Sequence, residues 1–192
     1  MTASNVRVLV PLAPGFEEIE AVTIVDVLRR AGLTVVTASL GDVAVTGAHD
    51  MVIQADTTLG AALKSSEAAD AAFDAVVLPG GMPGSAHLRD DPRVLAALRD
   101  VVSRDGLAAA VCAAPIALQA AGLLDGRTAT AYPSFLDQLV DATTSEERVV
   151  EDGPILTGAG PGAALEFALA VVGRLVSAEC AEALADGMLL KR

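Results

Sequence analysis

The chain has 192 residues, of which 53% are hydrophobic and only 3% aromatic, so aliphatic side chains would fill its core. Its net charge of −12 argues against nucleic acid and anionic membrane surfaces as partners, because both need a basic face. No apolar run approaches the ~20 residues that span a bilayer, and no signal-peptide pattern opens the chain, so we expect one cytoplasmic domain over residues 1–192 with free thiols.

Strand-like and helix-like segments alternate along the chain. Short runs rich in Val and Ala predict strands, whereas longer segments with acidic starts and glycine stops predict helices. In chain order, we expect a strand at 6–12, a helix at 16–32, a strand at 34–40, a hairpin at 43–56, a strand at 74–81, a helix at 91–106, a strand at 107–112, a helix at 114–124, a strand at 128–132, a hairpin at 148–157, and helices at 162–176 and 178–189. This alternation indicates an α/β fold with helices on both faces of a mostly parallel sheet.

Ligands of such sheets bind beyond the carboxyl ends of the strands, and three strand ends carry candidate chemistry. The first is "AAVCAAP", where Cys112 stands between small residues at a strand-to-helix turn. A nucleophile elbow places its reactive residue at such a turn, and the following helix N-terminus would lower the pKa of the thiol. A small buried hydrophobe is the other role that a free cysteine commonly plays, and this segment alone does not choose between them.

The second strand end is "LPGGMPG" at 78–84. Consecutive glycines after a buried strand allow a backbone N–H group to point into a site, as an oxyanion hole requires. An ordinary strand-to-loop turn explains the same letters. The segment contains neither a P-loop motif nor a G-x-G-x-x-G motif that opens a helix, and both of these bind phosphates. A nucleotide ligand is therefore disfavoured.

The third strand end, "APGFEEIEAV" at 13–22, holds three acids. Favourable interaction with the helix dipole at a solvated helix end explains Glu17. Glu20 shares its helix face with Phe16 and Ile24, and a carboxylate on an apolar stripe has the raised pKa that a general acid or base needs. Glu18 also has apolar neighbours on its face, so periodicity leaves the choice between Glu18 and Glu20 open.

Together these segments resemble the ThiJ/PfpI superfamily, in the branch of the parkinsonism-associated protein deglycase and the bacterial YajL protein. The resemblance runs over nearly the whole chain, through "PGFEEIEAV", "VDVLRRAG", "VVLPGG", "AVCAAP" and "RVVEDGPILTGAGPGAALEFALAVV". It implies a flavodoxin-like three-layer sandwich of the class I glutamine amidotransferase type, usually a homodimer. Cys112 matches the reactive cysteine of the family and Glu20 the acid beside it, while Gly81 and Ala113 match the residues whose N–H groups form the anion hole.

The chain departs from its relatives at several positions. Tyr132 stands where many glyoxalase-type relatives have a histidine, and His49 and Ala159 replace arginines of the human-like branch. We expect Tyr132 either to line the pocket or to be a plain core residue, and we include His49 among the pocket candidates. PfpI-type peptidases place a histidine directly after the cysteine, where this chain has Ala113, so a protease is not expected.

Two other residues have less specific signals. His87, in "GSAHLRD", follows the glycine turn and is expected on a surface loop more than in the pocket. Cys180, in "SAECAEAL", is expected to serve packing.

The resemblance implies an enzyme of the glyoxalase III or deglycase type that acts on 2-oxoaldehydes such as methylglyoxal without cofactor or metal. In this interpretation the Cys112 thiolate attacks the aldehyde, Glu20 moves the proton, and the N–H groups of Gly81 and Ala113 hold the oxyanion. The alternative is an oxidative-stress sensor or redox-regulated chaperone, in which Cys112 is oxidised and Glu20 binds the product. The same residues serve both functions, so the sequence does not separate them.

Overall fold

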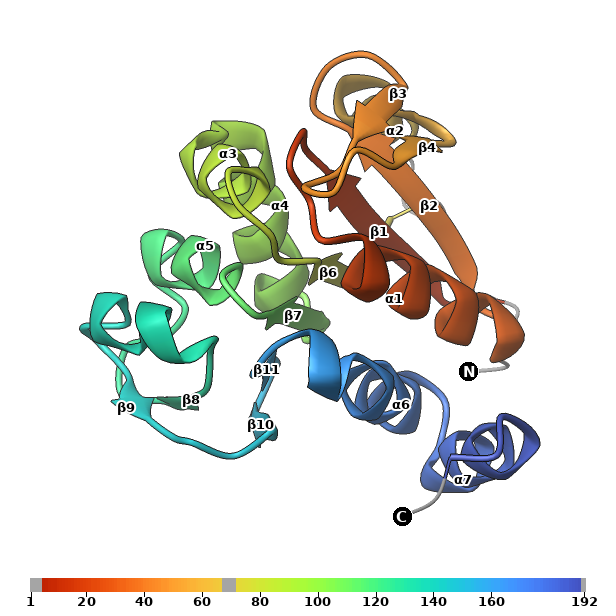
Figure 1. Ribbon diagram of the computed structural model, residues 1–192, viewed down its shortest axis with the longest axis vertical. Coiled ribbons are helices and arrows are strands. Elements are labelled where there is room, and N and C mark those ends of the chain that lie inside the picture. Colours follow the sequence, from red (N-terminus) through yellow and green to blue (C-terminus); the bar gives the residue numbers. More distant parts are fainter. Residues whose placement is uncertain (1–4, 67–71, 191–192) are drawn as a thin grey trace.

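A seven-stranded sheet forms the centre of the computed structural model, which describes residues 5–66 and 72–190 (Figure 1). The strand order is β10-β11-β7-β6-β1-β2-β5, and only β10 and β11 pair antiparallel. These strands span β1 Arg7–Leu12, β2 Thr34–Ser39, β5 Thr57–Thr58, β6 Ala75–Leu78, β7 Leu107–Val111, β10 Val149–Asp152 and β11 Ile155–Gly158. Because β1, β6, β7 and β11 run parallel, their carboxyl ends meet at one edge of the sheet, as the sequence predicted.

Helices cover both faces of the sheet, which confirms the predicted α/β sandwich (Figure 1). One face packs against α1 Glu18–Arg30, α6 Ala164–Leu175 and α7 Ala178–Gly187, and the other against α2 Leu59–Ser65, α3 Gly84–Asp90, α4 Pro92–Ser103 and α5 Pro115–Ala120. No helix in the described part of the chain is both long and apolar enough to cross a membrane.

Strand β7 shows how the sequence produces these two cores. All five of its residues are buried. Because side chains alternate along a strand, Ala109 and Val111 pack into the core under α1 and α6, and Ala108 and Ala110 into the core under α4 and α5. The small side chains let helices approach closely at the strand that ends in Cys112.

The predicted elements differ from the structure in three places. Residues 128–132 do not form a strand of the main sheet: β8 (Thr128–Ala129) pairs only with β9 (Thr143–Thr144), and a 3₁₀ helix follows at Pro133–Gln138. Helices α2 and α3 were not predicted. The sequence prediction for His87 is therefore wrong in part, because this exposed residue lies on α3 rather than on a loop.

The expected hairpins are confirmed: β10 and β11 turn at Gly153, and a separate antiparallel pair joins β3 Ala44–Thr46 to β4 Val52–Gln54. Residues 1–4, which belong to the segment that lacks a signal-peptide pattern, lie outside the described residues.

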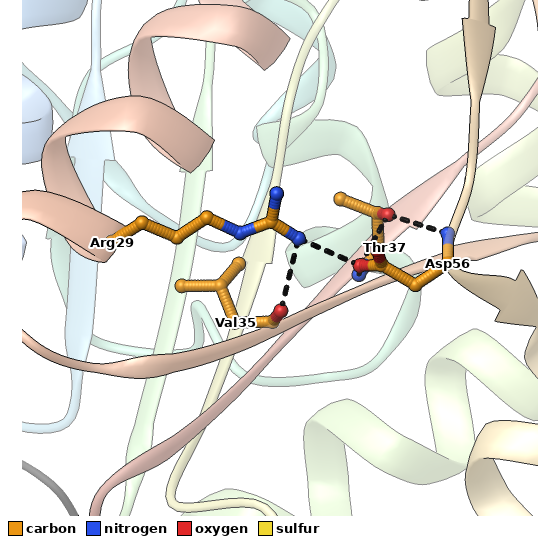
Figure 2. A network of polar contacts seen from close by, with 4 residues as sticks. All are labelled: Arg29, Val35, Thr37 and Asp56. Carbon is orange, nitrogen blue, oxygen red and sulfur yellow. Dashed lines mark hydrogen bonds and ion pairs between the residues drawn. The ribbon is translucent and has the colours of Figure 1, made fainter.

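A polar network fixes the C-terminal end of α1 over the sheet (Figure 2). The Arg29 guanidinium donates to the Val35 carbonyl at 3.3 Å and to Asp56 Oδ2 at 2.8 Å. The same carboxylate oxygen accepts the backbone N–H and the hydroxyl of Thr37, at 2.8 and 2.7 Å. The network ties α1, β2 and the segment before β5 together, and so helps to position the helix that carries Glu20.

Candidate active site

Cys112 lies at a sharp turn between β7 and α5. Its φ of +63° lies in the left-handed region, which costs a residue with a side chain about 1–3 kcal/mol. Two hydrogen bonds hold this conformation: the Cys112 N–H donates to the Gly158 carbonyl, and the Tyr132 N–H donates to the Cys112 carbonyl, both at 2.8 Å. The side chain is nearly buried, and only 8% of the residue is exposed. This is the geometry that the small residues around Cys112 predicted.

The Glu20 carboxyl reaches the same point from the first turn of α1. The residue is fully buried, and its Oε2 accepts the Gly80 N–H at 2.8 Å. A Cβ atom added to Gly80 would lie 2.6 Å from both Cys112 Cβ and Glu20 Oε2, so the two side chains converge on this glycine. No N–H or O–H group of the described residues reaches Glu20 Oε1. That oxygen is available for proton exchange with the thiol, which interacts directly with the carboxyl.

The backbone N–H groups of Gly81 and Ala113 interact with the Cys112 thiol and lower its pKa. Gly81 has a φ of +90°, and a Cβ there would lie 2.3 Å from the backbone nitrogen of Glu17. Only glycine therefore fits this turn. The two donors come from the ends of β6 and β7, which are neighbours in the sheet.

Burial raises the pKa of Glu20 to about 7, and the nearby Glu17 charge contributes in the same direction. Burial and the Glu20 carboxyl raise the pKa of Cys112 to about 12, while the N–H groups of Gly81 and Ala113 lower it. The expectation of a lowered thiol pKa is therefore contradicted: desolvation and the adjacent negative charge outweigh the backbone donors. At neutral pH the thiol therefore keeps its proton, while the carboxyl is ionised in part.

Glu17 is not the solvated residue that the sequence predicted. It is buried, and as the N-cap of α1 its carboxylate accepts the Glu20 N–H at 2.8 Å. Its own N–H donates to the Gly80 carbonyl at 2.9 Å. Glu17, Gly80 and Glu20 thus form a closed ring of hydrogen bonds. Sequence reasoning missed it because glutamate is not a preferred N-cap and because Gly80 lies 60 residues from Glu20 in the sequence.

Glu18 is also buried, but it points elsewhere. It binds His49 through the backbone N–H at 2.6 Å and through the imidazole Nδ1 at 2.7 Å. The structure thus brings Glu20, not Glu18, to Cys112. The His49 side chain is 68% exposed and faces Glu18 rather than the thiol.

The remaining candidates have contacts of other kinds. Tyr132 is 46% exposed, so the alternative that it is a plain core residue is wrong. It contacts Cys112 through the hydrogen bond between its backbone N–H and the Cys112 carbonyl. His87 contacts the Pro14 carbonyl at 3.2 Å. Cys180 is half-buried on α7 and packs against the core, as expected.

The chain is similar to known proteins over nearly its whole length. Residues 6–174 match the DJ-1/PfpI family. Protein dj-1beta of Drosophila melanogaster is 42% identical over 185 residues, which cover 95% of this chain and 96% of the relative. The glutathione-independent glyoxalase DJR-1.2 of Caenorhabditis elegans is 32% identical over 178 residues, covering 92% and 91%.

A solved structure, "Toxoplasma gondii DJ-1, oxidized", superposes with a TM-score of 0.89 at 39% identity, over 97% of this chain and 100% of that one. The agreement covers the sheet and the helices on both faces, and so confirms the resemblance found in the sequence motifs. The chain belongs to the DJ-1/PfpI family.

Proposed function

We propose that the chain is a cofactor-independent glyoxalase III or deglycase-type enzyme that converts 2-oxoaldehydes such as methylglyoxal, or their adducts, to the hydroxyacid. The observation that carries this proposal is the convergence of the Cys112 thiol and the buried Glu20 carboxyl at Gly80. A relative that shares 32% identity over nearly its whole length is named a glutathione-independent glyoxalase, which supports the same chemistry.

The pKa values make Glu20 the base that activates Cys112, because at neutral pH the carboxyl is ionised in part while the thiol is protonated. Sulfur adds to the aldehyde carbon as its proton passes to Glu20. Glu20 then gives this proton to the former carbonyl oxygen, which yields the hemithioacetal and leaves the carboxyl ionised. This revises the mechanism expected from the sequence, in which a preformed thiolate attacks. The N–H groups of Gly81 and Ala113, which interact with the thiol, would hold the developing oxyanion in this proposal.

The second half of the reaction moves hydrogen between the two carbons. Glu20 removes the proton from the former aldehyde carbon and returns it to the neighbouring carbon, while the hydroxyl proton of the hemithioacetal passes to the neighbouring carbonyl oxygen. These transfers leave a thioester on Cys112. Water then cleaves the C–S bond, releases the hydroxyacid and restores the thiol. The sum is one aldehyde plus one water to one hydroxyacid, with no external oxidant or reductant.

We further propose that the protein is a homodimer and that it works in a reducing compartment such as the cytoplasm. Four large apolar side chains on α1 and the β3–β4 hairpin are more than half exposed, and a second copy of the chain would cover them: Ile19, Val22, Met51 and Val52. A reducing compartment suits an enzyme that depends on a free thiol, and both cysteines are free in the structure.

The alternative, a sensor that works through oxidation of Cys112, has one observation in its favour. The Gly81 and Ala113 N–H groups that interact with the thiol would also bind the oxygens of a sulfinic acid. A methylglyoxal-to-lactate assay separates the two functions. Turnover that disappears in Cys112→Ser supports the enzyme, whereas no turnover together with selective oxidation of Cys112 supports the sensor.

A further inference from the structure

Two large side chains with apolar surface are exposed on segments that contact Cys112. Tyr132 and Met82 are each 46% exposed. The Tyr132 N–H donates to the Cys112 carbonyl at 2.8 Å, and Met82 directly follows Gly81, whose N–H interacts with the thiol. Single exposed apolar side chains are normal on a protein surface, but two that adjoin the same nucleophile indicate a surface that a ligand can cover.

The sheet supplies these two residues from opposite sides of Cys112. Strand β7, which leads to Cys112, lies between β11 and β6. Met82 follows β6, and the segment after β11 contains Gly160. A Cβ atom on Gly160 would be 3.2 Å from Tyr132 Cδ2 and 3.8 Å from Cε2, so one edge of the tyrosine ring lies against this glycine. Cys112 therefore has the aromatic residue on the β11 side and the methionine on the β6 side.

Space at the thiol itself is narrow. Only 8% of Cys112 is exposed, and a Cβ atom on Gly80 would lie 2.6 Å from Cys112 Cβ. The two carbons of a 2-oxoaldehyde that react must lie close to the sulfur and to the Glu20 carboxyl. The third substituent takes no part in the reaction. It therefore extends outward, toward the exposed side chains on either side of the thiol.

We propose that Tyr132, with Met82 on the other side of the thiol, selects 2-oxoaldehydes whose third substituent is aromatic, of which phenylglyoxal is the type. This inference rests on the proposed function and names the substrate class of the same site. Aromatic rings pack favourably against each other, and a thioether packs favourably against an aromatic ring. The methyl group of methylglyoxal covers little of either side chain. Phenylglyoxal and one water give mandelate by the steps described for methylglyoxal and lactate.

The test compares kcat/KM for phenylglyoxal, measured as mandelate, with kcat/KM for methylglyoxal, measured as lactate. We expect the wild type to have the lower KM for phenylglyoxal. Tyr132→Ala should lower the ratio of the two kcat/KM values by about 3- to 10-fold, mainly through KM, because the ring packs against bound substrate and transition state alike. Tyr132→Phe should keep the ratio because the ring is retained, and Met82→Ala should lower it. The matched control is Val140→Ala, which removes another exposed apolar side chain and should leave the ratio unchanged.

The ratio separates selectivity from structural damage, because a variant that unfolds or displaces Cys112 loses turnover of both aldehydes. A second readout uses the products as inhibitors: mandelate should inhibit methylglyoxal turnover more strongly than lactate does in the wild type, and no more strongly in Tyr132→Ala. A ratio that is unchanged in Tyr132→Ala, or lowered as much in Tyr132→Phe, would overturn this inference and leave the proposed function intact. Turnover of neither aldehyde by the wild type would overturn the proposed function, and this inference with it.

Discussion

Glu20→Gln separates the hydrogen-bonding role of the buried carboxyl from its role in proton transfer. The glutamine side chain has the same length, and its oxygen can accept the Gly80 N–H as Glu20 Oε2 does at 2.8 Å. Its amide cannot take up and release a proton. We expect methylglyoxal turnover to fall by about 10²-fold or more, or about 2.7 kcal/mol of transition-state stabilisation. Cys112 should still react with iodoacetamide, because its thiol is retained and loses the carboxylate that raises its pKa.

The same substitution should stabilise the fold at alkaline pH. The pKa of Glu20 is raised from 4.5 to about 7, so the folded state binds this proton more tightly than the unfolded state does. The favourable contribution of the protonated group is complete below pH 4.5 and is lost as the pH rises through 7. A shift of this size corresponds to a destabilisation on the order of 3 kcal/mol at pH 8. Because the glutamine side chain carries no charge, the variant should unfold at higher urea concentration than the wild type at pH 8, with a smaller difference at pH 5.

Both readouts require a lactate assay and urea unfolding curves at the two pH values, with a chelator present throughout. Glu166→Gln is the matched control, since Glu166 is exposed on α6 and pairs with Arg148, and surface pairs contribute little. Wild-type turnover in Glu20→Gln would refute the acid–base role. A variant that is less stable than wild type at pH 8 would refute the desolvation argument.

Three further predictions concern the thiol, the glycine turn and the assembly. Cys112→Ser should abolish turnover in the lactate assay, whereas Cys180→Ser should keep it. Gly80→Ala should lower the free energy of unfolding by about 1–3 kcal/mol and reduce turnover, because its Cβ would have contacts of 2.6 Å; Gly41→Ala, which meets nothing within 4 Å, should do neither. Wild-type protein should sediment as a dimer at micromolar concentration and Val22→Asp as a monomer; a monomeric wild type would contradict the proposed interface.

The sequence predicted the sheet well because its signal is local. Apolar runs such as β6 and β7 are continuous and buried on both faces, and helix ends were marked by residues such as Asp91, whose side chain caps α4. Helix α3 was not predicted because the segment "GSAHLRD" has no capping side chain and follows a glycine-rich turn, which is typical of a loop. The segment at 128–132 was assigned to a strand on composition alone, and nothing in it indicates which sheet it joins.

The site was predictable only in part, for a physical reason. Periodicity placed both Glu18 and Glu20 on partly apolar faces, and the family motif was needed to prefer one. What separates them is tertiary: Glu20 meets Gly80, whereas Glu18 meets His49 from a hairpin 31 residues away. The raised thiol pKa was likewise invisible in the sequence, because it depends on burial and on a charge brought in by another helix.

The environment of the thiol also bears on the sensor alternative. Peroxide reacts with the thiolate, so susceptibility follows thiolate content. Because burial and the Glu20 carboxyl raise the pKa of Cys112 well above its ordinary value, very little of the resting thiol is thiolate at pH 8. Since the Glu20 carboxyl contributes to this shift, Glu20→Gln should be oxidised faster than wild type.

Trapping of the sulfenic acid after brief treatment with peroxide, followed by mass spectrometry, measures this rate, with Cys180 in the same sample as the internal reference. Faster oxidation in the variant means that Glu20 suppresses the resting thiolate, as suits a base that deprotonates Cys112 only when a carbonyl substrate is present. Slower oxidation would mean that a protonated Glu20 stabilises the thiolate. The raised thiol pKa would then be refuted, and the same carboxyl that drives turnover in the enzyme would instead prepare Cys112 for oxidation.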